Sequence, residues 1–96
     1  MMFLHIIQAT PIGDFRVDVT FNDGKHGIAD LSEVVQRGVF AQLSNHEEFA
    51  KLYVDTELET IVWPNGADLA PEFVYFQAFK NDPSLAEQFK AWGYTH

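Results

Sequence analysis

Four histidines could act as general acids, general bases or metal ligands, and they are His5, His26, His46 and His96. No two of them have the spacing of one helical turn, and none belongs to an HExxH motif. His5 and His26 could approach each other only if their strands were neighbours in a sheet. Partly exposed strand histidines are therefore favoured over a metal site or an acid–base pair.

A second candidate for chemistry is a run of alternating carboxylates, Asp55, Glu57 and Glu59. Ca²⁺ prefers such oxygen ligands, but the run lacks the glycine and the final glutamate of an EF-hand loop. A solvated hairpin turn is the favoured interpretation. The chain also has no cysteine, no nucleophile elbow and no phosphate-binding glycine loop. We therefore expect no catalytic residue, no metal and no cofactor, and hence a protein that is not an enzyme.

The segment WPNGAD, which begins at Trp63, is the most distinctive motif of the chain. Pro64 cannot donate to a sheet, so a strand should end at Trp63. The Asn-Gly pair that follows favours a turn, and Asp68 could then cap a helix. In the favoured interpretation this segment is a strand-to-helix corner with Trp63 in the core. The alternative is that Trp63, Asn65 and Asp68 line a surface for a partner or ligand.

Half of the aromatic residues of the chain lie in residues 73–96. They cover more than one face of a helix, because Tyr75 and Phe76 are adjacent. Core packing and an oligomer or partner interface are both consistent with this enrichment. The candidate oligomer interface comprises Phe76, Phe79, Phe89 and Trp92.

The strands that must position these residues are indicated by alternation and by turn residues. Apolar and polar side chains alternate over residues 15–22, which predicts a half-buried strand. Asp23 and Gly24 should supply the positive φ angles of a hairpin turn into a strand at 25–30. Further strands are predicted at residues 3–9, 52–55 and 60–63. No connection is long enough for a parallel crossover, so the sheet should be antiparallel.

Short helices are predicted from capping residues. Asp30 and Ser44 each precede a glutamate by three residues, as in a capping box, and should begin helices at 31–37 and 46–52. Leu69, Phe73 and Phe76 have the spacing of one apolar helix face, and a last helix is predicted at 82–93. The expected fold is therefore α+β, a small antiparallel sheet of two hairpins with short helices and a helical C-terminus.

The composition sets limits on partners and location. The 96 residues suit a single domain, and the net charge of −8 would repel nucleic-acid phosphates. The N-terminal segment has neither the basic region of a signal peptide nor the length of a membrane span. We therefore expect a cytoplasmic protein that binds neither nucleic acid nor membranes. An acidic surface suits a basic partner, although it also serves solubility.

Three segments, FNDGKHGIADLSEVV, GVFAQL and VDTELETIVWPNGADLAPEFVY, resemble the prokaryotic domain-of-unknown-function (DUF) family 2442. The resemblance covers residues 3–76, which would form the family-like core, with the helix at 82–93 as an addition. It implies an α+β fold and no established activity. The motif residues that match the family are Asp23, Gly24, Asp30, Trp63, Pro64, Asn65, Gly66 and Asp68, and the resemblance implies no catalytic role for them.

The resemblance also implies two kinds of partner. Some members carry an added C-terminal helix-turn-helix domain and are regarded as DNA-binding regulators, but the 20 residues after residue 76 are too few for one. Others resemble the antitoxin side of toxin–antitoxin pairs. The leading hypothesis is a non-enzymatic protein-interaction domain, antitoxin-like, with a small basic partner and with self-association through its aromatic C-terminus. The alternative is a regulatory domain that binds a small molecule or a metal at the corner from Trp63 to Asp68.

Overall fold

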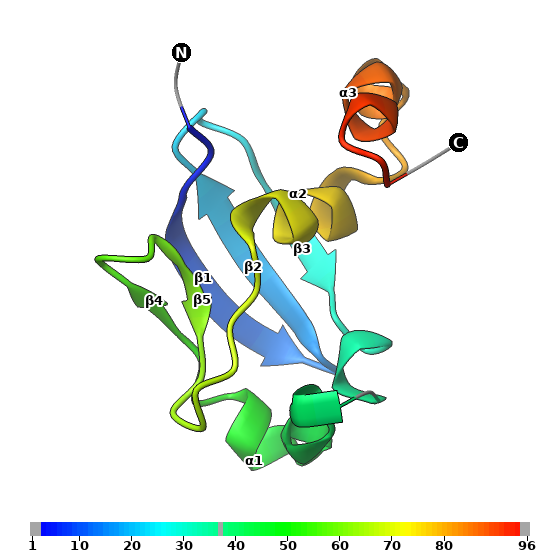
Figure 1. Ribbon diagram of the computed structural model, residues 1–96. Coiled ribbons are helices and arrows are strands. Elements are labelled where there is room, and N and C mark those ends of the chain that lie inside the picture. Colours follow the sequence, from blue (N-terminus) through cyan, green and yellow to red (C-terminus); the bar gives the residue numbers. More distant parts are fainter. Residues whose placement is uncertain (1–2, 37, 95–96) are drawn as a thin grey trace.

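The computed structural model describes residues 3–36 and 38–94, which form two antiparallel sheets and several short helices (Figure 1). The larger sheet has the order β1–β2–β3, with β2 in the centre. The smaller sheet is a hairpin of two strands that lies beside β1. The strands are β1 Ile6–Gly13, β2 Arg16–Phe21, β3 His26–Asp30, β4 Tyr53–Asp55 and β5 Thr60–Val62. The predicted α+β class is confirmed.

The first strand is shifted from the predicted residues 3–9, because it begins at Ile6 and continues through Pro11 to Gly13. Pro11 lies opposite Val17 of β2, although it has no N–H to donate. A proline is tolerated there because β1 is an edge strand of the sheet, where one side of the backbone needs no sheet partner. Irregular register on both sides of this segment shows that β1 bends along β2.

The hairpin between β2 and β3 has a different turn from the one expected. Gly24 has a φ of 88°, whereas Asp23 is not among the residues with positive φ. The Gly24 N–H donates to the Phe21 carbonyl at 3.0 Å, and the Phe21 N–H donates to the Lys25 carbonyl at 2.9 Å, which closes a three-residue loop. The turn therefore requires a glycine at one position only. Asp23 Oδ1 accepts from the Lys25 N–H at 2.9 Å within the turn, which leaves Oδ2 for contacts elsewhere.

The predicted helix at 31–37 is wrong. Asp30 is the last residue of β3, and its Oδ1 accepts from the Ser32 N–H at 3.0 Å in a local turn. Two 3₁₀ segments follow, η1 Val34–Gln36 and η2 Gly38–Ser44. This tighter form suits short pieces of chain. Helix α1, His46–Phe49, follows and is capped by Asn45 and not by Ser44, since Asn45 Oδ1 accepts from the Glu47 N–H at 2.8 Å.

The C-terminal part contains α2 Pro71–Phe79, the 3₁₀ turn η3 Pro83–Leu85 and α3 Ala86–Ala91. Helix α2 crosses one face of the larger sheet, and α3 lies beyond it (Figure 1). The apolar face predicted from Phe73 and Phe76 is not the one that α2 buries, because its buried residues are Val74 and Tyr75. Helix α2 is covered on two sides, so apolar residues occur all round it.

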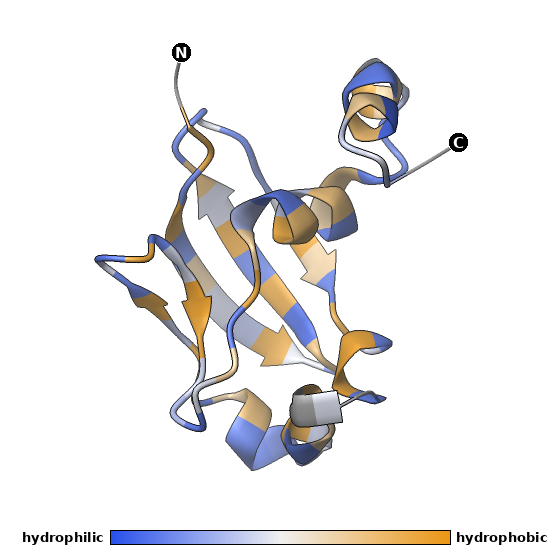
Figure 2. Ribbon diagram, viewed as in Figure 1, coloured by the Kyte–Doolittle hydropathy of each residue, from blue (hydrophilic) through white to orange (hydrophobic). Residues whose placement is uncertain are grey.

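The core lies between the larger sheet and the segments that cross it. Val17, Val19 and Phe21 are all fully buried on one face of β2, and apolar and polar residues alternate along this strand (Figure 2). The alternation predicted for this strand is therefore confirmed. Within residues 3–36 and 38–94, no helix is long and apolar enough to cross a membrane.

Candidate functional site

The WPNGAD segment forms a tight loop held by its own backbone. The Gly66 N–H donates to the Trp63 carbonyl, and the Trp63 N–H donates to the Ala67 carbonyl, both at 2.9 Å. Gly66 has a φ of 92°, which favours glycine. Asn65 Oδ1 accepts from the Ala67 N–H at 3.0 Å. Each of these residues therefore has a structural role in the loop.

Trp63 lies in the core, with 1% of its surface exposed. Its indole Nε1–H donates to the Phe49 carbonyl at 2.9 Å, and its ring packs against those of Phe49 and Phe40. The core position expected for Trp63 is confirmed, and its ring is not accessible to a partner. Of the three candidate surface residues in this corner, Asn65 and Asp68 are exposed.

Asp68 does not cap α2, contrary to the sequence-based expectation. It forms a β-bridge with Val62, and the Leu69 N–H donates to the Ile61 carbonyl at 3.2 Å. The chain thus runs on beside β5 before the helix begins. The N-cap is Ala70, which makes no side-chain hydrogen bond, and Pro71 occupies the first turn. Pairing with β5 therefore holds Asp68 away from the helix start.

The histidines do not form a pair. His5 contacts the Glu59 carboxylate, and His26 contacts the Asp18 carboxylate. His5 directly precedes β1 and His26 is the first residue of β3, and β2 separates these two strands. His46 packs against Phe15 with ring centroids 4.5 Å apart, and His96 lies outside the described residues. The described part of the chain holds no group of three or more His, Asp or Glu residues placed to bind a metal.

The candidate oligomer interface is largely occupied by contacts within the chain. Phe76 packs edge-on against Phe89 with centroids 5.0 Å apart, and Phe89 is 1% exposed. Phe79 lies over Gly27 of β3 and against Phe21. Trp92 is half-buried. Self-association through these residues stays a prediction.

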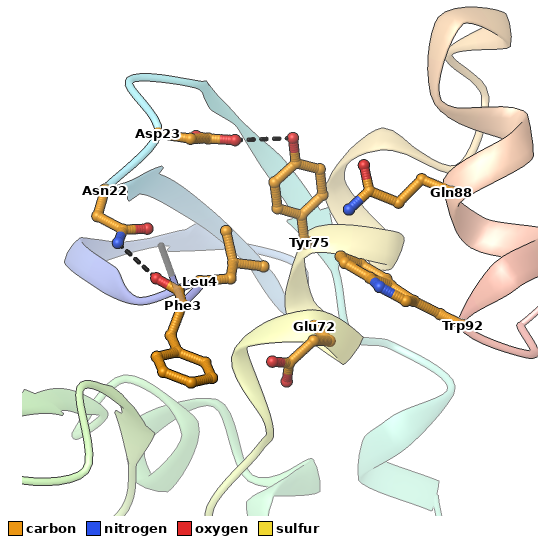
Figure 3. Close-up of a pocket in the computed structure, with 8 residues that line it drawn as sticks. All are labelled: Phe3, Leu4, Asn22, Asp23, Glu72, Tyr75, Gln88 and Trp92. Carbon is orange, nitrogen blue, oxygen red and sulfur yellow. Dashed lines mark hydrogen bonds between the residues drawn. The ribbon is translucent and has the colours of Figure 1, made fainter. Parts of the chain in front are cut away.

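A pocket of about 360 Å³ lies between the β2–β3 turn, the N-terminal segment, α2 and α3. Figure 3 shows the residues that line it, and we refer to it as the Tyr75 pocket. Two carboxylates, Asp23 and Glu72, and two aromatic side chains, Phe3 and Trp92, are among these residues. No local pattern in the sequence predicts this site, because its residues come from four separate segments. The only sequence signals were the Asp-Gly turn and the C-terminal aromatics.

The Tyr75 hydroxyl joins α2 to the tip of the hairpin. It donates to Asp23 Oδ2 at 2.9 Å (Figure 3). Burial of the phenol raises the pKa of Tyr75 well above its ordinary value, and the hydrogen bond to Asp23 and the negative charges of Asp23 and Asp82 raise it further. Tyr75 is therefore neutral at physiological pH, and the carboxylates around it create a negative potential.

The adjoining segment is also held by hydrogen bonds. Asn22 Oδ1 accepts from the His5 N–H at 2.9 Å, and Asn22 Nδ2 donates to the Phe3 carbonyl at 2.6 Å. These bonds attach the N-terminal segment to the hairpin and place Phe3, which is 72% exposed, at the pocket. A second hollow, of about 440 Å³, lies between η1, η2 and α2 and includes Glu33, Phe40 and Phe73.

The order of the motifs along this fold agrees with a family match. The model of the family described as Protein of unknown function (DUF2442) matches residues 6–80. The chain belongs to this family. The match includes the WPNGAD loop, β1 to β5 and α2, whereas η3 and α3 lie beyond it. The resemblance proposed from the motifs is therefore confirmed, and family membership supplies no activity.

A solved structure shares the fold of this DUF2442 protein. It is the crystal structure of a protein from Nitrosomonas europaea named as a putative DNA binding protein, with a TM-score of 0.73 and 13% sequence identity. The similarity covers 97% of this chain and 63% of that one, so this chain spans less than two thirds of its structural neighbour. At this identity the likeness shows the fold alone. A comparison with curated proteins finds no match.

Proposed function

We propose that this DUF2442 protein is a non-catalytic interaction domain that binds a basic protein partner, with an antitoxin-like pairing with a small toxin as the specific form. The observation that carries the proposal is its unneutralised acidic surface. The chain has 14 acidic and 6 basic residues, and none of the carboxylate residues is buried. Within residues 3–36 and 38–94, only Arg16 and Lys51 form ion pairs as Lys or Arg side chains. Such a surface favours association with a positively charged protein.

Two other functions have weaker support. DNA binding is suggested by the name of the Nitrosomonas europaea protein, but a net charge of −8 opposes contact with phosphates. A regulatory domain that binds a small molecule or a metal at the corner would have to do so without the ring of Trp63, which is buried. Asn65 is also engaged, since its Nδ2 donates to Gln42 Oε1 at 3.3 Å.

Native mass spectrometry of the tagged protein, purified gently from its own host, tests the proposal. We expect a complex with a small basic protein in a fixed stoichiometry. The complex should weaken as NaCl is raised, because salt screens attraction between exposed charges. A monomer or dimer with a reproducible small added mass would contradict the proposal and favour a ligand-binding domain. A bare oligomer would leave self-association as the supported activity.

A further inference from the structure

We propose that the Tyr75 pocket binds a cationic side chain, lysine or arginine, presented by the basic partner. This proposal rests on the proposed function, and it specifies where on this protein a positive charge of the partner would bind. The cation would lie in the pocket that the carboxylates of Asp23 and Glu72 and the indole of Trp92 help to line. These three groups come from the hairpin tip, from α2 and from the end of α3 (Figure 3).

The charges of the pocket all have one sign. Asp23 and Glu72 line it, and no Lys or Arg among residues 3–36 and 38–94 does so. Neither carboxylate forms an ion pair within that part of the chain. The Lys25 N–H donates to Asp23 Oδ1 at 2.9 Å, but within residues 3–36 and 38–94 the Lys25 ammonium forms no ion pair with Asp23. A cation entering the pocket would therefore meet carboxylates that lack a positive partner.

The volume of the pocket is sufficient for a lysine or arginine side chain. Its volume of about 360 Å³ lies near the lower end of the range of about 300–1,000 Å³ that is usual for ligand sites. Trp92 is half-buried, so part of its indole is available to a cation, and Phe3 is 72% exposed. Aromatic faces attract ammonium and guanidinium groups through their negative quadrupole.

Tyr75 lines the pocket but contributes little accessible surface to it. Its side chain is almost fully buried, with 3% exposed, and its ring centroid lies 5.9 Å from that of Trp92 at 85°. The hydroxyl is occupied as a donor to Asp23, which leaves its oxygen as an acceptor. The amides of Asn22 and Gln88 add polar groups at the rim. The site therefore offers acceptors and aromatic surface together, which is the chemistry that a cationic side chain needs.

The test is an NMR titration with capped amino acids that carry the proposed group. Nα-acetyl-lysine methylamide and Nα-acetyl-arginine methylamide should shift the Trp92 indole N–H and the side-chain amides of Asn22 and Gln88. Nα-acetyl-norleucine methylamide, which has no charge, should not. The variant Glu72→Gln should weaken binding at least about threefold, whereas Glu57→Gln, the same change on the β4–β5 turn, should have no effect. Absence of shifts at the pocket would overturn the assignment.

The native complex separates failure of the pocket from failure of the proposed function. If Glu72→Gln and Glu57→Gln bind the basic partner equally well, the pocket assignment falls and the interaction function stands. If the capped side chains bind but the host supplies no protein partner, the interaction function falls and the cation site stands. A diamine such as putrescine that binds more tightly than both capped side chains would overturn the partner side chain as the source of the cation.

Discussion

Single residues in this protein have roles that depend on how deeply they are buried. Trp63 and Asp68 belong to the same motif, yet Trp63 is in the core and Asp68 is exposed. Tyr75 is nearly as buried as Trp63, but its hydroxyl reaches Asp23 at the hairpin tip. Substitutions at these positions should therefore separate stability from recognition.

Trp63→Phe should lower the free energy of unfolding by roughly 2–4 kcal/mol. The smaller phenyl ring leaves a cavity in the core, and it cannot donate the hydrogen bond that the indole makes to the Phe49 carbonyl. Asp68→Asn should change the free energy of unfolding by less than about 0.5 kcal/mol, because the side chain is exposed. Urea unfolding of the two variants measures the difference. Equal losses would show that Asp68 also has a structural role.

The raised pKa of Tyr75 predicts a loss of stability at high pH. The neutral phenol is favoured in the folded state, so its contribution is complete below the ordinary pKa of 10.0 and is lost as the pH rises above it. The free energy of unfolding should therefore fall more steeply above pH 10 in the wild type than in Tyr75→Phe. Urea unfolding between pH 8 and pH 11 measures both slopes. Parallel slopes would mean that burial does not favour the neutral phenol.

At the scale of elements, α2 packs against both the larger sheet and α3. Its Tyr75 and Phe79 pack against Phe21 of the sheet, and Phe76 packs against Phe89 of α3. The close approach to the sheet depends on Gly27 of β3. A Cβ at that position would lie 2.7 Å from Cε1 of Phe79. The absence of a side chain at Gly27 therefore allows α2 to cross close to β3.

Gly27→Ala should destabilise the protein by about 1–3 kcal/mol, because the added methyl group displaces the Phe79 ring. In a Phe79→Ala background the same substitution should cost less, since the clash is gone. A double-mutant cycle by urea unfolding measures this coupling, which should be at least about 0.5 kcal/mol. If the effects of the two substitutions on the free energy of unfolding were additive, the Phe79 ring would not be the cause of the loss in Gly27→Ala.

At the scale of the whole molecule, the acidic charge is spread over a small body. The principal extents are 35 × 28 × 21 Å, and the net charge is −8. Like charges on such a body repel one another at low salt, and this repulsion opposes the compact state. The acidic surface that is proposed to attract a partner therefore also lowers the stability of the isolated protein.

Added salt should stabilise the isolated protein. Raising NaCl from about 10 mM to about 150 mM shortens the screening length from about 30 Å to about 8 Å, which weakens repulsion across the molecule. The free energy of unfolding should therefore rise over this range, while the affinity for a basic partner falls. A fall in stability would show that the attractive ion pairs, such as Lys51–Glu48, outweigh the repulsion.

Much of the sheet follows from local sequence alone. The alternation in β2, the glycine in its turn and the end of β5 before Pro64 depend on side-chain period and on backbone geometry, which are properties of a few consecutive residues. The core position of Trp63 could likewise be expected from a strand that stops in an Asn-Gly turn. The same local patterns indicated the α+β class, and the motifs added the family resemblance.

The tertiary structure decided the helix boundaries and the Tyr75 pocket. Asp68 had the pattern of a cap, but its pairing with Val62 satisfies the backbone differently. The face that α2 buries depends on having the sheet on one side and α3 on the other. Asp23 and Glu72 are far apart in the chain, and only the crossing of α2 over the sheet brings them to one pocket. Local patterns determine the strands and turns, whereas contacts between distant segments determine where the helices begin and which side chains meet.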